Sequence, residues 1–163
     1  MTENQFYLNI LEILNIKKVE YIIIGGYAVI YHGYEYSIND MDIWYKPTKE
    51  NAEKIFDIIK ELGYDTSKLK IKDLLEINVN SIPVWNRDGF GKVDFMSAAT
   101  IMGNLSFDEV VKRAKNFKYM HIEVKVLSYD DLIKVKQQAN RKKDQVHISY
   151  LEKIRKHIQN LKK

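Results

Sequence analysis

The 163-residue chain contains no cysteine, only two prolines and only seven glycines. The absence of cysteine excludes disulfides, thiolate zinc sites and a cysteine nucleophile, and it is compatible with a reducing cytoplasm. Because proline and glycine are so scarce, the sequence has no evident linker, and it has no internal repeat. We therefore expect one domain over residues 1–163, with a core at about 19–127 and a helical C-terminal part at about 128–163.

The sequence also lacks the long apolar run, roughly 20 residues, that is needed to span a bilayer. Its first residues, MTENQFYLNILEIL, have neither a basic segment nor a small-residue cleavage site. Four histidines stand at positions 32, 121, 147 and 157, without the spacing of metal ligands. We therefore expect a cytoplasmic protein with no membrane partner.

Charge is distributed unevenly, although the net value is only +4. Residues 1–111 carry 11 Lys/Arg and 17 Asp/Glu, whereas residues 112–163 carry 15 Lys/Arg and 5 Asp/Glu. An acidic N-terminal part is typical of metal or cation binding, and a basic C-terminal part is typical of phosphate or nucleic-acid contacts. A lysine-rich solvated face on C-terminal helices would produce the same basic half.

Helical and strand patterns alternate along the chain, which predicts an α/β or α+β fold with a mixed sheet of about four or five strands, flanking helices and C-terminal helices. Strands are predicted at 19–24, 41–45, within 71–80, at 92–96 and at 121–127. Helices are predicted near the N-terminus, at 27–33, from Pro47 to Gly63, from Ser106 to about 116, from Ser128 onward, and through the tail.

Two carboxylates, Asp40 and Asp42, stand one residue apart at the start of the second predicted strand. Residues i and i+2 of a strand point to the same face, roughly 6.5–7 Å apart at Cα. The two charges repel unless a cation lies between them, and Mg²⁺ prefers such oxygen ligands. Taken alone, the D-x-D pair is more typical of a solvated turn, because Asn39-Asp40 also favours a turn.

A third carboxylate, Asp94, interrupts the otherwise apolar strand KVDFM. A charge in such a strand is costly to bury unless it is paired or bound to a metal, although an edge-strand aspartate facing water would escape that cost. Asp94 is therefore the candidate third ligand, and two metals roughly 3.5–4 Å apart are a common arrangement in phosphate chemistry.

Gly25 and Gly26 separate the first predicted strand from a short helix. Glycine at this position lets the backbone approach a ligand, and free N–H groups there suit an anion. A tight structural turn has the same sequence signature. The pair matches neither the Walker P-loop nor the G-x-G-x-x-G pattern.

The combination of strand, Gly-Gly, short helix, D-x-D strand and a later aspartate resembles the nucleotidyltransferases of the DNA polymerase β-like superfamily. Over roughly residues 19–155, the chain looks like bacterial minimal nucleotidyltransferases related to AbiEii-type toxins. The matching segments are IIIGGYAVIYHGY, DMDIWYKPTKENAEKIFDIIKELGY, KVDFM with LSFDEVVKRA, and LSYDDLIKVKQQANRKKDQVHISYLEKI. The resemblance implies an enzyme that moves an NMP from an NTP to a hydroxyl of RNA, protein or a small molecule. It also implies a cognate antitoxin as a partner.

The resemblance further implies a role for each matching residue. Asp40, Asp42 and Asp94 would bind two Mg²⁺ ions, with Mn²⁺ as a substitute, and Gly25 and Gly26 would hold the β- and γ-phosphates. The late segment would contribute nucleotide contacts from Lys136, Arg141, Lys143 and Asp144. We expect Lys136 and Lys143 to share one helix face, two turns apart.

Two departures from the family pattern keep other functions open. Tyr36 and Ile38 stand where an R-x-T pattern usually precedes the aspartate pair, and His147 stands where an acidic residue is common. A non-catalytic module that binds a nucleotide or a partner protein is one alternative. A basic nucleic-acid-binding module using the C-terminal half is the other.

Overall fold

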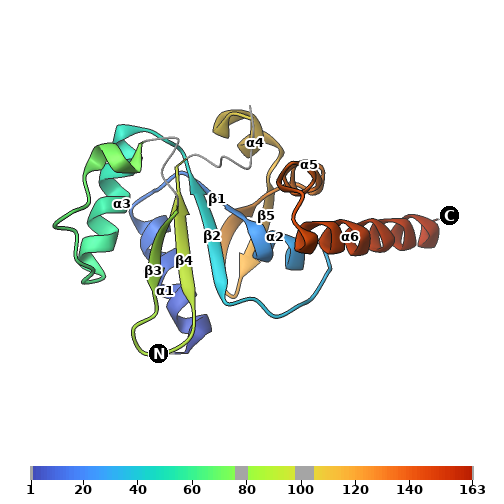
Figure 1. Ribbon diagram of the computed structural model, residues 1–163, viewed down its shortest axis with the longest axis horizontal. Coiled ribbons are helices and arrows are strands. Elements are labelled where there is room, and N and C mark those ends of the chain that lie inside the picture. The colour runs from blue at the N-terminus through green and yellow to red at the C-terminus, as the bar shows by residue number, and fades with distance from the viewer. Residues whose placement is uncertain (1, 76–80, 98–104, 163) are drawn as a thin grey trace.

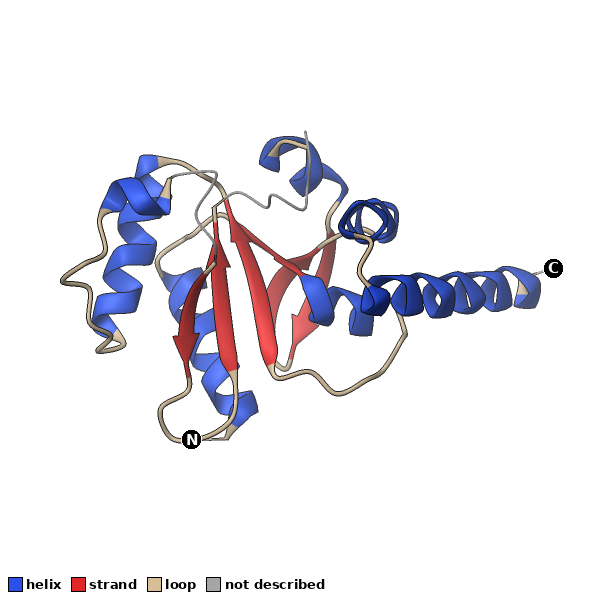
Figure 2. Ribbon diagram, in the orientation of Figure 1, coloured by secondary structure: helices blue, strands red, loops and turns tan. Residues whose placement is uncertain are grey.

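Across the described residues, a mixed sheet of six strands runs through the middle of the molecule, with helices around it (Figures 1 and 2). The computed structural model describes residues 2–75, 81–97 and 105–162. The strands lie in the order β3-β4-β2-β1-β6-β5. Their bounds are β1 Tyr21–Ile24, β2 Asp40–Tyr45, β3 Ile82–Trp85, β4 Lys92–Met96, β5 Lys115–Tyr119 and β6 Ile122–Val126.

The helices are α1 Glu3–Ile16, α2 Gly25–Tyr31, α3 Lys49–Glu61, the 3₁₀ helix η1 Ile71–Leu74, α4 Phe107–Arg113, α5 Tyr129–Ala139 and α6 Lys142–Leu161. The predicted α+β class and mixed sheet are confirmed, but the six strands in the described part of the chain exceed the predicted four or five. None of the helices in the described ranges is both long and apolar enough to cross a bilayer.

The two sheet edges account for the difference in strand number. The helix that begins after Ser106 ends at Arg113 rather than about 116, because β5 begins at Lys115 and pairs with β6 as a hairpin. The other edge strand, β3, lies at 82–85 and contains Pro83. Proline favours an edge because it cannot donate a ladder hydrogen bond. Of the strand predicted within 71–80, residues 71–74 form η1 instead, and residues 76–80 lie outside the described residues.

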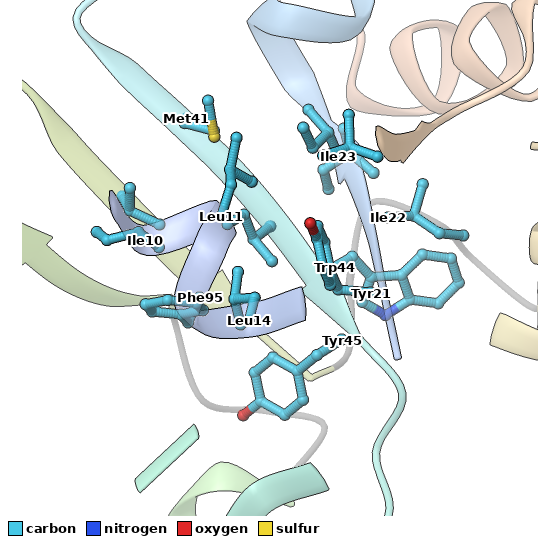
Figure 3. Packing of buried hydrophobic residues seen from close by; sticks show 14 of the residues in the cluster. Ile10, Leu11, Leu14, Tyr21, Ile22, Ile23, Met41, Trp44, Tyr45 and Phe95 are labelled. Carbon is cyan, nitrogen blue, oxygen red and sulfur yellow. The ribbon is translucent and has the colours of Figure 1, made fainter. Parts of the chain in front are cut away.

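One face of the sheet is packed against α1. Side chains on this helix recur at helical spacing, and Ile10, Leu11 and Leu14 have no exposed surface. Figure 3 shows them in the same hydrophobic cluster as Met41 and Phe95, which come from β2 and β4. Because side chains alternate along a strand, Asp40, Asp42 and Asp94 lie on the opposite face from Met41 and Phe95.

The directions of the strands determine which segments meet at the end of the sheet where β2 begins with Asp40. The strands β2 and β4 are parallel and both begin there, whereas β1 is antiparallel to β2 and ends there. The strand β6 is parallel to β1, so its carboxyl end also arrives at this end. The chain then passes through Leu127, whose N–H donates to Ile23 O, directly into α5. The last two helices are therefore brought to the same end of the sheet as Gly25.

The helices α5 and α6 are separate elements joined at a sharp turn. Asn140 has φ +47°, the left-handed conformation that ends a helix, and Arg141 is the N-cap of α6. The predicted shared helix face for Lys136 and Lys143 is therefore wrong, since the two residues lie on different helices. In the tail, Leu151 is buried as expected, but Ile158 and Leu161 near the end of α6 are exposed.

Candidate active site

Register between β2 and β4 brings the three predicted carboxylates together. Asp42 lies opposite Asp94 in the parallel pair, and Asp40 precedes Asp42 on the same face. One oxygen from each carboxylate lies within 4.8 Å of the others. The side chain of Asp94 is only 8% exposed, because β4 is an interior strand, while that of Asp40 is 46% exposed. The edge-strand alternative for Asp94 is therefore wrong.

Gly25 leaves room for the carboxylate of Asp42. Its φ is +64°, and a Cβ built there would lie 1.8 Å from Asp42 Oδ2. Any side chain at position 25 would both strain the backbone and displace the carboxylate. The Gly-Gly turn and the aspartate pair, which are separated in sequence, are thus in direct steric contact.

Burial and neighbouring charge make ionisation of Asp42 less favourable than that of an exposed aspartate. Burial is the main cause, and the negative charges of Asp40 and Asp94 add to it, so that the pKa of Asp42 rises to about 6. The positive charges of Lys92 and Lys143 act in the opposite direction. A divalent cation among these oxygens would relieve the repulsion between them.

Tyr36 and Ile38 pack against the second glycine of the turn. A Cβ built on Gly26 would meet Tyr36 Oη at 2.8 Å and Ile38 Cγ2 at 3.0 Å. Tyr36 thus places a hydroxyl beside Gly26, although the threonine of the family pattern is replaced by isoleucine. Burial first, and then the charge of Asp40, raises the pKa of Tyr36 to about 12, so the phenol remains a hydrogen-bond donor at neutral pH.

A cluster of ion pairs connects the start of α6 to α5. Asp144 has no exposed side-chain surface and accepts hydrogen bonds from Lys136 Nζ at 3.2 Å and Arg141 Nε at 2.7 Å. Burial opposes ionisation of Asp144, but the bonds from Arg141 and Lys136 outweigh it and hold the pKa of this carboxyl below its usual range. Burial lowers the pKa of Lys136 despite its bond to Asp144. Three of the predicted nucleotide contacts are therefore paired with one another, with two cations sharing one carboxylate.

Lys143 is placed differently from those three residues. It is exposed, and no salt bridge to it occurs among the described residues. Its charge nevertheless lowers the pKa of Asp42, as does that of Lys92, which places Lys143 within electrostatic range of Asp42. Arg141 also interacts electrostatically with Asp42, but it is paired with Asp144, whereas Lys143 has no ion-pair partner among the described residues.

Two further residues of the site were missed in the sequence. Lys92 lies on the same face of β4 as Asp94, with its ammonium 2.6 Å from Asp94 Oδ2. Ser81 Oγ donates to the other oxygen of Asp94 at 3.2 Å. The pattern K-x-D on a strand could have identified Lys92, because a period of two puts both side chains on one face. No comparable signal marks Ser81.

The donor set fits a hard divalent cation. Three carboxylates converge, two of them are partly accessible to solvent, and no thiolate exists in the chain to favour a softer metal. Asp40, Asp42 and Asp94 would hold the ion. The arrangement is a cluster of carboxylate oxygens beside two glycines, and Asp42 fills the space that a Cβ on Gly25 would occupy.

Comparisons with known proteins bear on the fold. No protein-family model and no curated protein matches the sequence. The structure is similar to TM1012 from Thermotoga maritima, assigned as a nucleotidyltransferase, with a TM-score of 0.57 and 15% identity over 96% of this chain and 92% of that one. It is also similar to the lincosamide antibiotic adenylyltransferase LnuA with lincomycin bound, with a TM-score of 0.57 and 16% identity over 94% of this chain and 98% of that one. The chain therefore has the fold of the nucleotidyltransferases.

Proposed function

We propose that this protein is a divalent-metal-dependent nucleotidyltransferase that moves an NMP from an NTP to a hydroxyl acceptor. The observation that carries the proposal is the convergence of Asp40, Asp42 and Asp94 immediately beside Gly25. In the reaction, the acceptor oxygen forms a bond to the α-phosphorus and the bond from that phosphorus to the bridging oxygen breaks. Pyrophosphate leaves, and the acceptor's proton passes to a base.

The three aspartates are the residues that would hold magnesium, as two ions or with Mn²⁺ as a substitute. Bound there, the metal supplies charge neutralisation on the phosphates and activation of the attacking oxygen. The protein's own contribution is to keep the three carboxylates fixed through the pairing of β2 with β4. Asp94, the most buried of them, is the candidate proton acceptor.

Several groups around the triad suit the triphosphate. The amides of Gly25 and Gly26 would approach the β- and γ-phosphates, with the Tyr36 hydroxyl beside them. Lys143, which has no salt bridge among the described residues, would add a positive charge. Asp144 with Lys136 and Arg141 would act by holding the start of α6 in place, so that Lys143 faces the site. Catalysis would then come mainly from positioning and electrostatic stabilisation.

The acceptor would be a hydroxyl of RNA, protein or a small molecule. The basic C-terminal region, with 15 Lys/Arg against 5 Asp/Glu over residues 112–163, supports an RNA acceptor. The similarity to an adenylyltransferase with an antibiotic bound supports a small-molecule acceptor. The sequence resemblance to AbiEii-type proteins supports a toxin of a toxin–antitoxin or abortive-infection system, with an antitoxin as partner.

The test is incubation of the protein with each α-labelled NTP and Mg²⁺, in the presence of total RNA, a protein lysate or a panel of small hydroxyl compounds that includes lincomycin. We expect label to enter one acceptor class with the wild-type protein. An Asp40→Asn/Asp42→Asn variant, which retains the volume of both side chains, should transfer none. Transfer that persists in this variant would overturn the proposal.

A toxin role has its own test. Induced expression of the wild-type protein in a bacterial host should arrest growth, and the Asp40→Asn/Asp42→Asn variant should not. Arrest by both proteins would show that toxicity, where it exists, does not need the triad.

A further inference from the structure

Lys92 occupies a position that a metal ion would compete for. Its ammonium lies 2.6 Å from Asp94 Oδ2 and 3.9 Å from Asp40 Oδ2. The side chain is 22% exposed, and its nitrogen lies 5.4 Å from the centroid of the Trp85 ring. A single positive charge thus touches one carboxylate of the triad and is in range of a second.

The pairing of the two strands requires this placement. Lys92 stands directly opposite Asp40 in the parallel register of β2 and β4, just as Asp94 stands opposite Asp42. Two positions apart on β4, Lys92 and Asp94 also point to the same face. Three carboxylates and one ammonium are therefore built into a single two-strand unit.

Asp94 already has a partner on each oxygen. Ser81 Oγ donates to Oδ1, and the Lys92 ammonium contacts Oδ2. A magnesium ion bound to Oδ2 would lie at most about 4.7 Å from the ammonium, the sum of the 2.6 Å ion pair and a magnesium–oxygen bond of roughly 2.1 Å. At that separation the two cations repel strongly in a partly buried site.

We propose that Lys92 is an internal counter-ion of the triad, which neutralises the carboxylates while the metal is absent and is displaced from Asp94 when a divalent cation binds. The proposal rests on the proposed function only in taking the triad as the metal site. Lys92 is a positioning residue on this view, because it acts on the affinity of the site for metal through Asp94. The displaced ammonium remains on a flexible side chain at the edge of the site, where it can meet an incoming phosphate.

When the charge of Lys92 is removed, the stability of the metal-free protein should fall and its affinity for metal should rise. Lys92→Met keeps the length of the aliphatic chain and removes the ammonium. We expect Mg²⁺ to bind this variant on the order of tenfold more tightly than wild type, measured by titration calorimetry. In EDTA the variant should melt at a lower temperature, because three carboxylates lose their counter-ion, and saturating Mg²⁺ should remove most of that difference.

Lys92→Arg is the matched control, because it retains the positive charge. Its Mg²⁺ affinity should stay within about threefold of wild type. Lys92→Gln, a second neutral variant, guards against a folding defect peculiar to methionine. If the neutral variants bind Mg²⁺ no more tightly than wild type, the competition is refuted.

Trp85 offers a direct report of the displacement, since it is 60% exposed and in contact with the ammonium. Mg²⁺ should change the tryptophan fluorescence of the wild-type protein, and most of that change should be lost in Trp85→Phe and in Lys92→Met. Trp44 is buried and hydrogen-bonded to Ser97 O, so it should contribute little. A change that survives intact in Trp85→Phe would show that Lys92 does not move.

These measurements separate failure of the inference from failure of the proposed function. Wild-type protein that binds Mg²⁺ and transfers label, with neutral variants of unchanged affinity, overturns only the counter-ion role. A protein that binds no Mg²⁺ in wild-type or in Lys92→Met form overturns both.

Discussion

Gly25 and Asp42 are in such close contact that a Cβ on the glycine would lie 1.8 Å from the Oδ2 atom of the aspartate. The contact joins the end of β1 to the start of β2, which are antiparallel neighbours with Ile24 opposite Asp42. Backbone conformation at one residue thus determines where the carboxylate of another can lie.

The first prediction concerns this contact. Gly25→Ala should rotate the Asp42 carboxylate out of the triad and weaken Mg²⁺ binding at least tenfold, with a loss of unfolding free energy above about 1 kcal/mol. Titration calorimetry and urea unfolding measure the two effects. Gly63→Ala is the matched control, because Gly63 also has a positive φ, +79°, but its nearest neighbour is Arg87. It should lose stability and keep its Mg²⁺ affinity; equal loss of affinity in both variants would contradict a steric cause.

The second prediction concerns the loss of folding stability when Asp42 is ionised. Its pKa is raised to about 6, so the folded protein binds more protons than the unfolded chain between about pH 4 and 6, and stability falls as pH rises through that window. Asp42→Asn should therefore increase the unfolding free energy of the metal-free protein by about 2–3 kcal/mol at pH 7.5 while abolishing transfer. Urea unfolding in EDTA at pH 7.5 and pH 4 tests this. A gain that is equal at both pH values would rule out an electrostatic origin.

The third prediction concerns the hydroxyl beside Gly26. Tyr36→Phe removes one phenolic donor but retains the ring contacts with Tyr34 and His147. We expect the KM for the NTP to rise about fivefold, the equivalent of one hydrogen bond of about 1 kcal/mol, with an unchanged melting temperature. Steady-state kinetics and thermal unfolding provide the two readouts. An unchanged KM would remove Tyr36 from the nucleotide site.

The fourth prediction separates two lysines of the late segment. Lys143→Ala should raise the KM for the NTP severalfold and change the unfolding free energy by less than about 0.5 kcal/mol, because Lys143 is exposed. Lys136→Ala should instead cost about 3 kcal/mol of stability, since it breaks a buried ion pair with Asp144. The comparison needs kinetics and chemical denaturation on both variants. A larger stability loss for Lys143→Ala than for Lys136→Ala would contradict the assignment.

The fifth prediction concerns acid stability. His147 is buried, and its Nδ1 has no hydrogen-bond partner within the described parts of the chain. Burial, and then the charge of Lys136, lowers the pKa of His147 to about 4. The unfolded chain, with a histidine pKa near 6.5, then binds the proton first, so stability is lost as pH falls from 6.5 towards 4.

His147→Gln removes the titrating group and should abolish that loss. Between pH 6.5 and pH 5, the unfolding free energy of wild type should fall by about 1–2 kcal/mol relative to the variant. Parallel urea titrations at several pH values give this difference and cancel contributions from other groups. A difference that stays constant with pH would mean that His147 does not titrate in this range.

Local sequence patterns were sufficient for most of the fold. The strand–Gly-Gly–helix unit, the D-x-D strand and the KVDFM strand were all predicted, because their hydrophobic periods are clear and their ends carry glycine or capping residues. The structure places Asp40, Asp42 and Asp94 together as expected. The edge strands β3 and β5 were not predicted, because a strand with a partner on only one side and much solvent exposure has little hydrophobic pattern.

Contacts across the sheet and between helices could not be predicted from the sequence. The pairing of Lys92 with the triad depends on the register of β2 with β4, which no local pattern specifies. Similarly, the helix break at Asn140 places Lys136 on α5 and Lys143 on α6, so the two lysines do not share a helix face. Lys136 instead forms a buried ion pair with Asp144. The contact of Tyr36 with Gly26 is also a tertiary contact that no local pattern predicts, because a loop residue packs there against the glycine turn.

The parallel pairing of β2 with β4 has a consequence for how this protein can vary. The chain leaves β2 after Tyr45 and reaches β4 at Lys92. Among the described residues of this intervening segment, Ser81 is the one whose side chain is hydrogen-bonded to an aspartate of the triad, Asp94. Insertions or deletions in the loops of this segment, outside α3 and β3, should therefore be tolerated, because the pairing of β2, β4 and β3 holds the charged residues. A single-residue insertion inside either strand would turn its charges toward α1 and could not be repaired by any nearby substitution. Natural or designed variants of this scaffold should accordingly differ in the loops between β2 and β4 and preserve the strands β2, β3 and β4.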